Sequence, residues 1–259
     1  MLKEIINTLP AYDYLYLGDN LRAPYGNKTF ETVYQYTLEA VKWLFNQDCH
    51  LIILACNTAS AKALRSIQQN DLPGIDPAKR VLGVIRPTAE VIGKFTKTNH
   101  IGVLGTSGTI QSESYLIEIG KFFPHLKVSQ EACPEWVELV ENNLYQSKAA
   151  DEPVKNHIQH ILGADASIDA LLLACTHYPL LLPKIEEHVP AGIKIISQGE
   201  IVAQSLKDYL GSHPEIVKKC TQTQTRRFCT TGDVKEFNRH AGSFFGSTVI
   251  AESVNLNEK

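Results

Sequence analysis

The sequence lacks several features that would place it in a common class. No apolar run approaches the roughly 18 residues that a membrane span needs. There is no basic excess, because the net charge is -3, and this balance argues against nucleic acid as the main partner. The first residues also lack the apolar stretch of a secretory signal. We therefore expect a cytoplasmic protein that uses neither a membrane nor nucleic acid.

The spacing of the six cysteines excludes further classes. No pair has C-x-x-C spacing, which argues against a structural zinc site, and we expect no metal. An intracellular chain of 259 residues is expected to keep its thiols free. Apolar residues make up 44% of the chain, which is enough for a globular core in one or two domains.

Short apolar runs alternate with amphipathic stretches along most of the chain. Residues 51–55, 101–104 and 170–174 are such runs, and residues 29–47 have helical spacing of apolar side chains. This alternation is typical of a doubly wound α/β fold, in which helices cover both faces of a parallel sheet. Ligands bind such sheets at the carboxyl ends of the strands.

An internal similarity predicts two lobes. Residues 51–58 and 171–177 both form an apolar run that ends in Ala-Cys and continues with small polar residues. We expect two similar parallel-sheet lobes with the active site between them. The first lobe, residues 1–88 and 198–259, carries Cys56, and the second lobe, residues 89–197, carries Cys175.

Cys56 and Cys175 each follow a predicted buried strand and open a predicted helix. A helix N-terminus lowers the pKa of a thiol, and two thiols on opposite faces of one carbon could act as base and acid and invert it. The alternative is that both are core cysteines at tight turns. Polar neighbours favour the functional interpretation, and they are Asn57, Thr58, Thr176 and His177.

Further motifs occur in a characteristic order. They are Gly18-Asp19-Asn20, RAPYGNK at 22–28, ACNTASA at 55–61, GVIRP at 83–87, GVLGT at 102–106 with Thr109, Cys133-Pro134, Val140-Glu141 and LACTHYPL at 173–180. Together they resemble the glutamate racemase family of the aspartate/glutamate racemase superfamily, and the resemblance covers about residues 1–250.

The resemblance implies a role for each matching residue. Cys56 and Cys175 would be the acid/base pair, and Glu141 and His177 would assist Cys175. Without the resemblance, Glu141 is a solvated charge and the Pro24-Tyr25-Gly26 motif is an ordinary loop. The implied substrate-binding residues are Pro24, Tyr25, Gly26, Asn57, Thr58, Thr106, Thr109 and Thr176.

The resemblance also implies the wider properties of the enzyme. It would interconvert L- and D-glutamate without cofactor or metal, and its D-glutamate would supply peptidoglycan synthesis and so support the cell wall and cell shape. Family members are usually homodimers, and we expect the same here. Two alternatives stay open, namely a racemase for aspartate and a non-catalytic binding protein on a degraded racemase fold.

One family feature is absent from the sequence. The family begins with an apolar strand and an Asp-Ser-Gly motif, and this strand would be an interior member of the first lobe's sheet. Its two neighbours would each lack a partner along one edge, so we expect low activity and low stability for the chain as given. Three interpretations are open, namely a true start that lies upstream, a shortened chain, or an inactive copy, and we favour the first.

Overall fold

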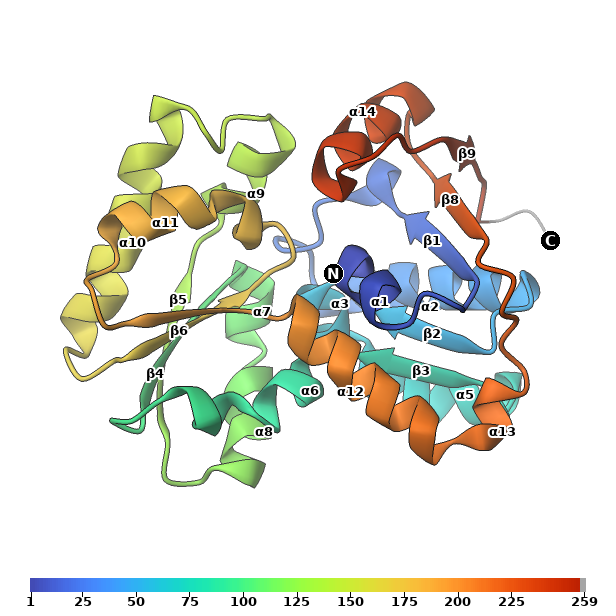
Figure 1. The fold of residues 1–259 in the computed structure, drawn as a ribbon, viewed down its shortest axis with the longest axis horizontal. Helices are drawn as coiled ribbons and strands as arrows, with labels where there is room; N and C mark the ends of the chain where they lie inside the picture. The colour runs from blue at the N-terminus through green and yellow to red at the C-terminus, as the bar shows by residue number, and fades with distance from the viewer. Residues whose placement is uncertain (257–259) are drawn as a thin grey trace.

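The chain folds into two lobes that lie side by side, each built from parallel strands and helices (Figure 1). The structure is a computed structural model and describes residues 1–256. Every strand pair in this described part is parallel. The expected α/β class, with parallel sheets in two lobes, is therefore confirmed.

Helices separate most of the successive strands. The strands are β1 (Tyr14–Gly18), β2 (Leu51–Leu54), β3 (Arg80–Gly83), β4 (His100–Gly105), β5 (Lys127–Ala132), β6 (Ala170–Ala174), β7 (Lys194–Ser197), β8 (Arg226–Thr230) and β9 (Ala251–Ser253). The α-helices are α1 (Leu2–Thr8), α2 (Phe30–Asn46), α3 (Asn57–Lys62), α4 (Leu64–Ser66), α5 (Leu72–Ile75), α6 (Ile85–Ala89), α7 (Ser107–Gln111), α8 (Ser114–Phe122), α9 (Glu135–Glu141), α10 (Asp151–Ala164), α11 (Leu182–His188), α12 (Gly199–Ser212), α13 (Pro214–Val217) and α14 (Val234–Phe245). Other short helical segments are η1 (Asn20–Arg22), η2 (Ile67–Asp71), η3 (Ile92–Phe95), η4 (Lys148–Ala150) and η5 (Tyr178–Leu181). Within the described part of the chain, no helix is both long and apolar enough to cross a membrane.

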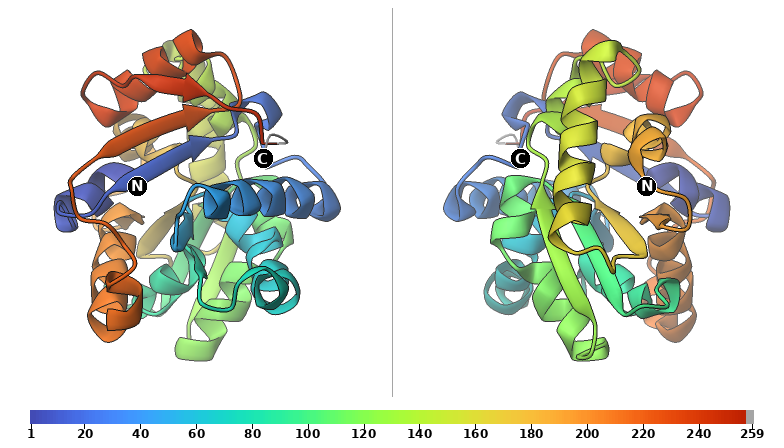
Figure 2. Two further views of the ribbon diagram at one scale, coloured as in Figure 1. Left: turned by 90° about the vertical axis from the view of Figure 1, so that its right-hand side faces the viewer. Right: turned by 90° about the vertical axis from the view of Figure 1, so that its left-hand side faces the viewer.

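The second lobe contains a four-stranded sheet in the order β5-β4-β6-β7. All residues of β6 are buried because helices cover both faces, as an all-apolar strand requires. Leu171 and Leu173 pack toward α10 and α11, while Leu172 belongs to the core on the α8 side. Figure 2 shows α10 lying across one face of this sheet.

The strands of the first lobe form two sheets. One has the order β1-β8-β9 and the other pairs β2 with β3. No ladder joins β1 to β2 within residues 1–256, so each has one edge without a strand partner. Ile5 of α1 belongs to the same apolar cluster as Tyr14 of β1 and Ile53 of β2. Apolar contacts therefore connect the two sheets where backbone hydrogen bonds do not.

The chain enters the second lobe before β4 and leaves it after β7 (Figure 1). Strands β4 to β7 lie within residues 89–197, and the remaining strands lie in 1–88 and 198–256. The last three residues assigned to the first lobe, 257–259, lie outside the described residues. Helix α12 returns the chain from β7 to the first lobe, where it packs against α1 and α6.

A buried polar network joins the lobes at the start of α12. Gln198 donates from Nε2 to the hydroxyl of Tyr115 at 2.6 Å and to Oγ1 of Thr88 at 2.9 Å. Its Oε1 accepts from Nδ2 of Asn57 at 2.8 Å. Tyr115 in turn donates to Oδ1 of Asn57 at 2.6 Å. Each of these buried polar side chains therefore has hydrogen-bond partners within the network, as buried polar groups require.

Replacing Tyr115 by Phe tests this network. The change removes the hydroxyl and leaves Asn57 Oδ1 without its donor, so we expect a loss of about 1–3 kcal/mol in the free energy of unfolding. Urea denaturation measures it. Tyr145→Phe is the control, because its hydroxyl has no hydrogen bond within the described residues, and its change is expected within about 0.5 kcal/mol. Equal losses in the two variants would show that the network contributes nothing.

Candidate active site

Cys56 lies between the end of β2 and the first turn of α3, where it is the N-cap residue. Its side chain is exposed, yet the protein around the sulfur still raises the pKa of the thiol by desolvation. Backbone N–H groups of Ala59 and Thr58 act in the opposite direction. The expected help from the helix N-terminus is present, but the expectation that it lowers the pKa of Cys56 overall is wrong, because desolvation outweighs it.

Cys175 directly follows β6 in the second lobe and is 7% exposed. Its sulfur lies 3.8 Å from Nδ1 of His177. The other ring nitrogen of His177, Nε2, lies 2.5 Å from Oε1 of Glu141, which ends α9. The structure thus brings three of the sequence-predicted catalytic residues into one chain of contacts.

The contacts among Cys175, His177 and Glu141 favour an imidazolium at His177 at neutral pH. Burial alone lowers the pKa of His177, but hydrogen bonds to Cys175 and Glu141, together with their charges, raise it to about 10. The hydrogen bond between His177 and Glu141 also lowers the pKa of Glu141. A carboxylate and a cation therefore stand in line behind the Cys175 sulfur.

The two thiols are close enough to influence each other. Negative charge on Cys175 raises the pKa of Cys56, although the residues belong to different lobes. The two sulfurs therefore lie within electrostatic reach of each other. A pair coupled in this way favours one thiolate and one thiol over two thiolates.

The loop of residues 24–28, which we call the PYG loop, is held by contacts around Asp19. The hydroxyl of Tyr25 donates to the Asp19 carboxylate, which also accepts from Nε of Arg22 at 2.7 Å and from Oγ1 of Thr231 at 2.8 Å. Burial, followed by the bond to Asp19, raises the pKa of Tyr25. Pro24 follows a cis peptide bond. The Tyr25 hydroxyl therefore holds the loop in position.

Gly26 brings the PYG loop against the second lobe. Its carbonyl accepts from the N–H of Gly108 at 2.9 Å. A Cβ atom at Gly26 would stand 3.0 Å from Cβ of Thr106, which leaves little room for a side chain. The expected importance of a glycine here has a steric basis, namely the close approach of two lobes.

Three predicted threonines form one buried cluster. Thr58 Oγ1 lies 2.9 Å from Thr106 Oγ1 and 3.3 Å from Thr109 Oγ1, and Thr106 also caps α7. Thr58 comes from the first lobe and the other two from the second. Hydroxyl groups can turn to bond a carboxylate or ammonium that enters between them. Thr176 is half-buried beside Cys175.

Asn57 is placed differently from the threonines. It is 2% exposed, and both ends of its side-chain amide are engaged by Tyr115 and Gln198. One N–H of its amide has no hydrogen-bond partner within the described residues. Its position next to Cys56 means that this network also fixes the turn that carries the thiol.

Several residues near the site carry no motif that singles them out. Tyr115 and Gln198 support Asn57, and Lys62 holds the PYG loop. Desolvation raises the pKa of Tyr16, and negative charge on Glu141 and Cys56 raises it further, so Tyr16 lies within electrostatic reach of both groups. The only sequence signal is position, since Tyr16 lies in a predicted strand and Gln198 follows another. Among residues 1–256, no cluster of three or more acidic, His or Cys side chains could hold a metal.

Replacing Glu141 by Gln tests the His177 pair. The variant loses the carboxylate that stabilises the imidazolium, so we expect the pKa of His177 to fall from about 10. Titration of the imidazole by NMR measures it, and Glu138→Gln on the exposed side of α9 is the control. An unchanged pKa of His177 in Glu141→Gln would contradict the pairing.

The same variant gives a pH window for stability. Because folding raises the pKa of His177 above 6.5, its contribution is fully present below pH 6.5 and is lost as pH rises through about 10. Folding lowers the pKa of Glu141 below 4.5, so its contribution is present above pH 4.5 and is lost as pH falls through that lowered pKa. The excess stability of the wild type over Glu141→Gln is therefore expected to be largest between pH 4.5 and 6.5.

Comparison with known proteins places this geometry in a family. The family model for Asp/Glu/hydantoin racemase matches residues 1–206. The glutamate racemase of Enterococcus faecalis is 38% identical over 263 residues, with 99% of this chain and 91% of the relative covered. The crystal structure of a glutamate racemase isoform from Bacillus anthracis has a TM-score of 0.90 at 35% identity and covers 100% of this chain and 93% of that chain.

A second structure has been solved with a ligand. The glutamate racemase of Francisella tularensis in complex with D-glutamate has a TM-score of 0.86 at 28% identity and covers 99% of this chain and 92% of that chain. These similarities extend over nearly the whole chain, both lobes included. The chain therefore belongs to the Asp/Glu/hydantoin racemase family and is an amino-acid racemase.

Proposed function

We propose that this enzyme interconverts L-glutamate and D-glutamate with Cys56 and Cys175 as its two acid/base groups. The observation that supports the mechanism most strongly is structural: two cysteines from different lobes each lie just after the end of a strand, and His177 and Glu141 stand in line behind the sulfur of Cys175. The substrate follows from the relatives, since those compared above are glutamate racemases that align over most of their length. Neither a cofactor nor a metal enters the proposed steps.

The proposed reaction moves one proton at each face of the α-carbon. A thiolate on one side removes the α-proton, and the electron pair left on carbon spreads into the adjacent carboxylate. The thiol on the other side then donates its proton to the opposite face and becomes the thiolate. The first sulfur ends protonated, so reversal of the substrate's hand simply exchanges the two roles.

The surroundings of the two sulfurs support a division of charge. The His177 imidazolium stabilises negative charge on Cys175, and Glu141 holds that imidazolium in place. No charged side chain hydrogen-bonds Cys56 in the described part of the chain, where backbone N–H groups approach it instead. The surroundings of the two thiols therefore differ, because an imidazolium lies beside Cys175 and backbone N–H groups lie beside Cys56.

The threonine cluster and the PYG loop are proposed to bind the substrate's ammonium and carboxylate groups. Thr58, Thr106 and Thr109 offer hydroxyls from both lobes, and Thr176 adds one beside Cys175. Pro24, Tyr25 and Gly26 would contact the substrate through backbone and ring atoms, and Asn57 through its remaining N–H. A substrate held by both lobes would bring its α-carbon between the two sulfurs.

Other expectations remain proposals beside the reaction. We infer a role in supplying D-glutamate to peptidoglycan, a cytoplasmic location and a homodimer, all from the family resemblance. Assays with glutamate and aspartate side by side decide the substrate. Exchange of the substrate's α-hydrogen with deuterated water separates an enzyme from a binding protein, because only an enzyme breaks that bond.

Replacing either Cys56 or Cys175 by Ser tests the two-thiol mechanism. Each variant loses one acid/base group, so we expect racemisation to fall by roughly 10²–10⁴-fold. Circular dichroism of glutamate solutions measures the rate. Cys220→Ser is the matched control, because Cys220 is half-buried in a separate apolar cluster near Tyr12, and its rate is expected to match the wild type. Retained racemisation in either active-site variant would overturn the mechanism.

A further inference from the structure

Two carbonyl groups of the PYG loop accept hydrogen bonds from other parts of the molecule. The carbonyl of Gly26 accepts from the backbone N–H of Gly108 in the second lobe at 2.9 Å. Two residues later, the carbonyl of Lys28 accepts from Nζ of Lys62 at 2.8 Å. Lys62 is the last residue of α3, the short helix that begins directly after Cys56. The loop is therefore tied both to the second lobe and to the helix of a catalytic cysteine.

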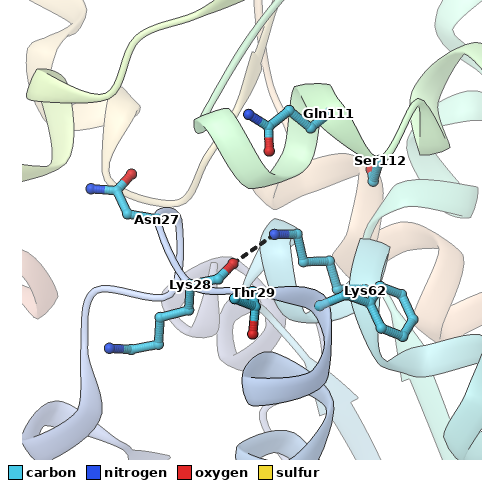
Figure 3. Close-up of a pocket in the computed structure, with 7 residues that line it drawn as sticks. Asn27, Lys28, Thr29, Lys62, Gln111 and Ser112 are labelled. Atoms are coloured by element: carbon cyan, nitrogen blue, oxygen red, sulfur yellow. Dashed lines mark hydrogen bonds between the residues drawn. The ribbon is translucent and has the colours of Figure 1, made fainter.

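Lys62 stands in an unusual environment for a lysine. Its residue is 9% exposed, and its ammonium has no ion-pair partner within the described residues. Desolvation lowers its pKa. In Figure 3 the ammonium points along a pocket of about 420 Å³ toward the Lys28 carbonyl. The pocket is lined by residues of both lobes, namely Asn27, Lys28, Thr29, Phe30, Lys62, Gln111 and Ser112.

The three parts of the molecule meet tightly at this point. A Cβ atom at Gly108 would lie 2.8 Å from the carbonyl oxygen of Gly26 and 2.9 Å from Nζ of Lys62. There is consequently no room for a side chain between the second lobe, the loop and the lysine. A displacement of the ammonium would free the Lys28 carbonyl and loosen the loop next to its contact with Gly108.

Stability alone does not account for a lysine at this position. Partly desolvating a charge without a counterion costs free energy, and an apolar residue of similar length would avoid that cost. What the lysine adds is a charge-assisted hydrogen bond, which is stronger than a neutral one and restricts the carbonyl that it holds. The charge of Lys62 therefore serves to fix the loop.

We propose that Lys62 is a positioning residue that fixes the PYG loop and thereby sets the affinity for the amino-acid substrate. The inference rests on the proposed function, because only there does this loop bind substrate. Lys62 acts through the backbone of Lys28 and Gly26 and does not touch the reacting atoms. Its removal therefore weakens substrate binding and leaves the proton transfers at the two thiols in place.

The test compares Lys62→Met with a matched lysine. Lys79 lies in the same lobe and also donates from Nζ to a backbone carbonyl, that of Phe45 at 2.7 Å, far from the PYG loop. We expect Lys62→Met to raise KM roughly tenfold in both directions, as the loss of a charge-assisted hydrogen bond predicts, with kcat within about twofold. Lys79→Met is expected to keep the wild-type KM. Lys62→Arg, which retains a cationic donor, is expected to recover part of the affinity.

Hydrogen exchange of residues 23–30 gives a readout that does not depend on activity. We expect faster exchange in Lys62→Met and wild-type exchange in Lys79→Met. Unchanged exchange in Lys62→Met and Lys62→Gln overturns the proposal, and so does faster exchange with an unchanged KM. If the wild type does not racemise glutamate, the proposed function fails, and calorimetric binding of D-glutamate replaces KM. An equal Kd in wild type and Lys62→Met then overturns the proposal for Lys62.

Discussion

Helix α3 begins directly after Cys56 and is fastened to the second lobe by buried hydrogen bonds on its first turn. Asn57 bonds to Tyr115 and Gln198, and Thr58 bonds to Thr106 and Thr109. These bonds fix where one lobe's thiol stands relative to the other lobe. Because a racemase must approach one carbon from two faces, this attachment is the constraint on which the geometry of the site depends.

The two halves of the site are similar in backbone and different in charge. Both cysteines follow a buried strand, but only Cys175 has a histidine and a carboxylate lined up beside it. Cys56 is surrounded by backbone N–H groups and is sensitive to the charge on its counterpart. The two thiols therefore stand in different electrostatic surroundings, although both lie just after the end of a strand.

Sequence patterns predicted the positions of the strands and helices better than they predicted the electrostatics of the site. The repeated Ala-Cys strand ends and the two-lobe α/β class follow from apolar periodicity, which depends on local spacing alone. The pKa of Cys56 was predicted in the wrong direction, because the packing of distant segments around a sulfur decides its desolvation. The support of Asn57 is likewise not visible in the sequence, because its amide bonds at both ends to residues far along the chain. The spacing of residues along the sequence does not predict hydrogen-bond partners that are so far apart in the chain.

The sequence by itself determined the parallel-strand architecture and the placement of Cys56 and Cys175 at strand ends, because buried strands and helix starts have local signatures. It also supplied the motifs that identify the family. Only the tertiary structure decided that Glu141 stands behind His177, that Gln198 and Tyr115 hold Asn57, and that Lys62 grips the PYG loop. These contacts join residues distant in the chain, and their energies depend on burial, which arises only when the lobes have packed.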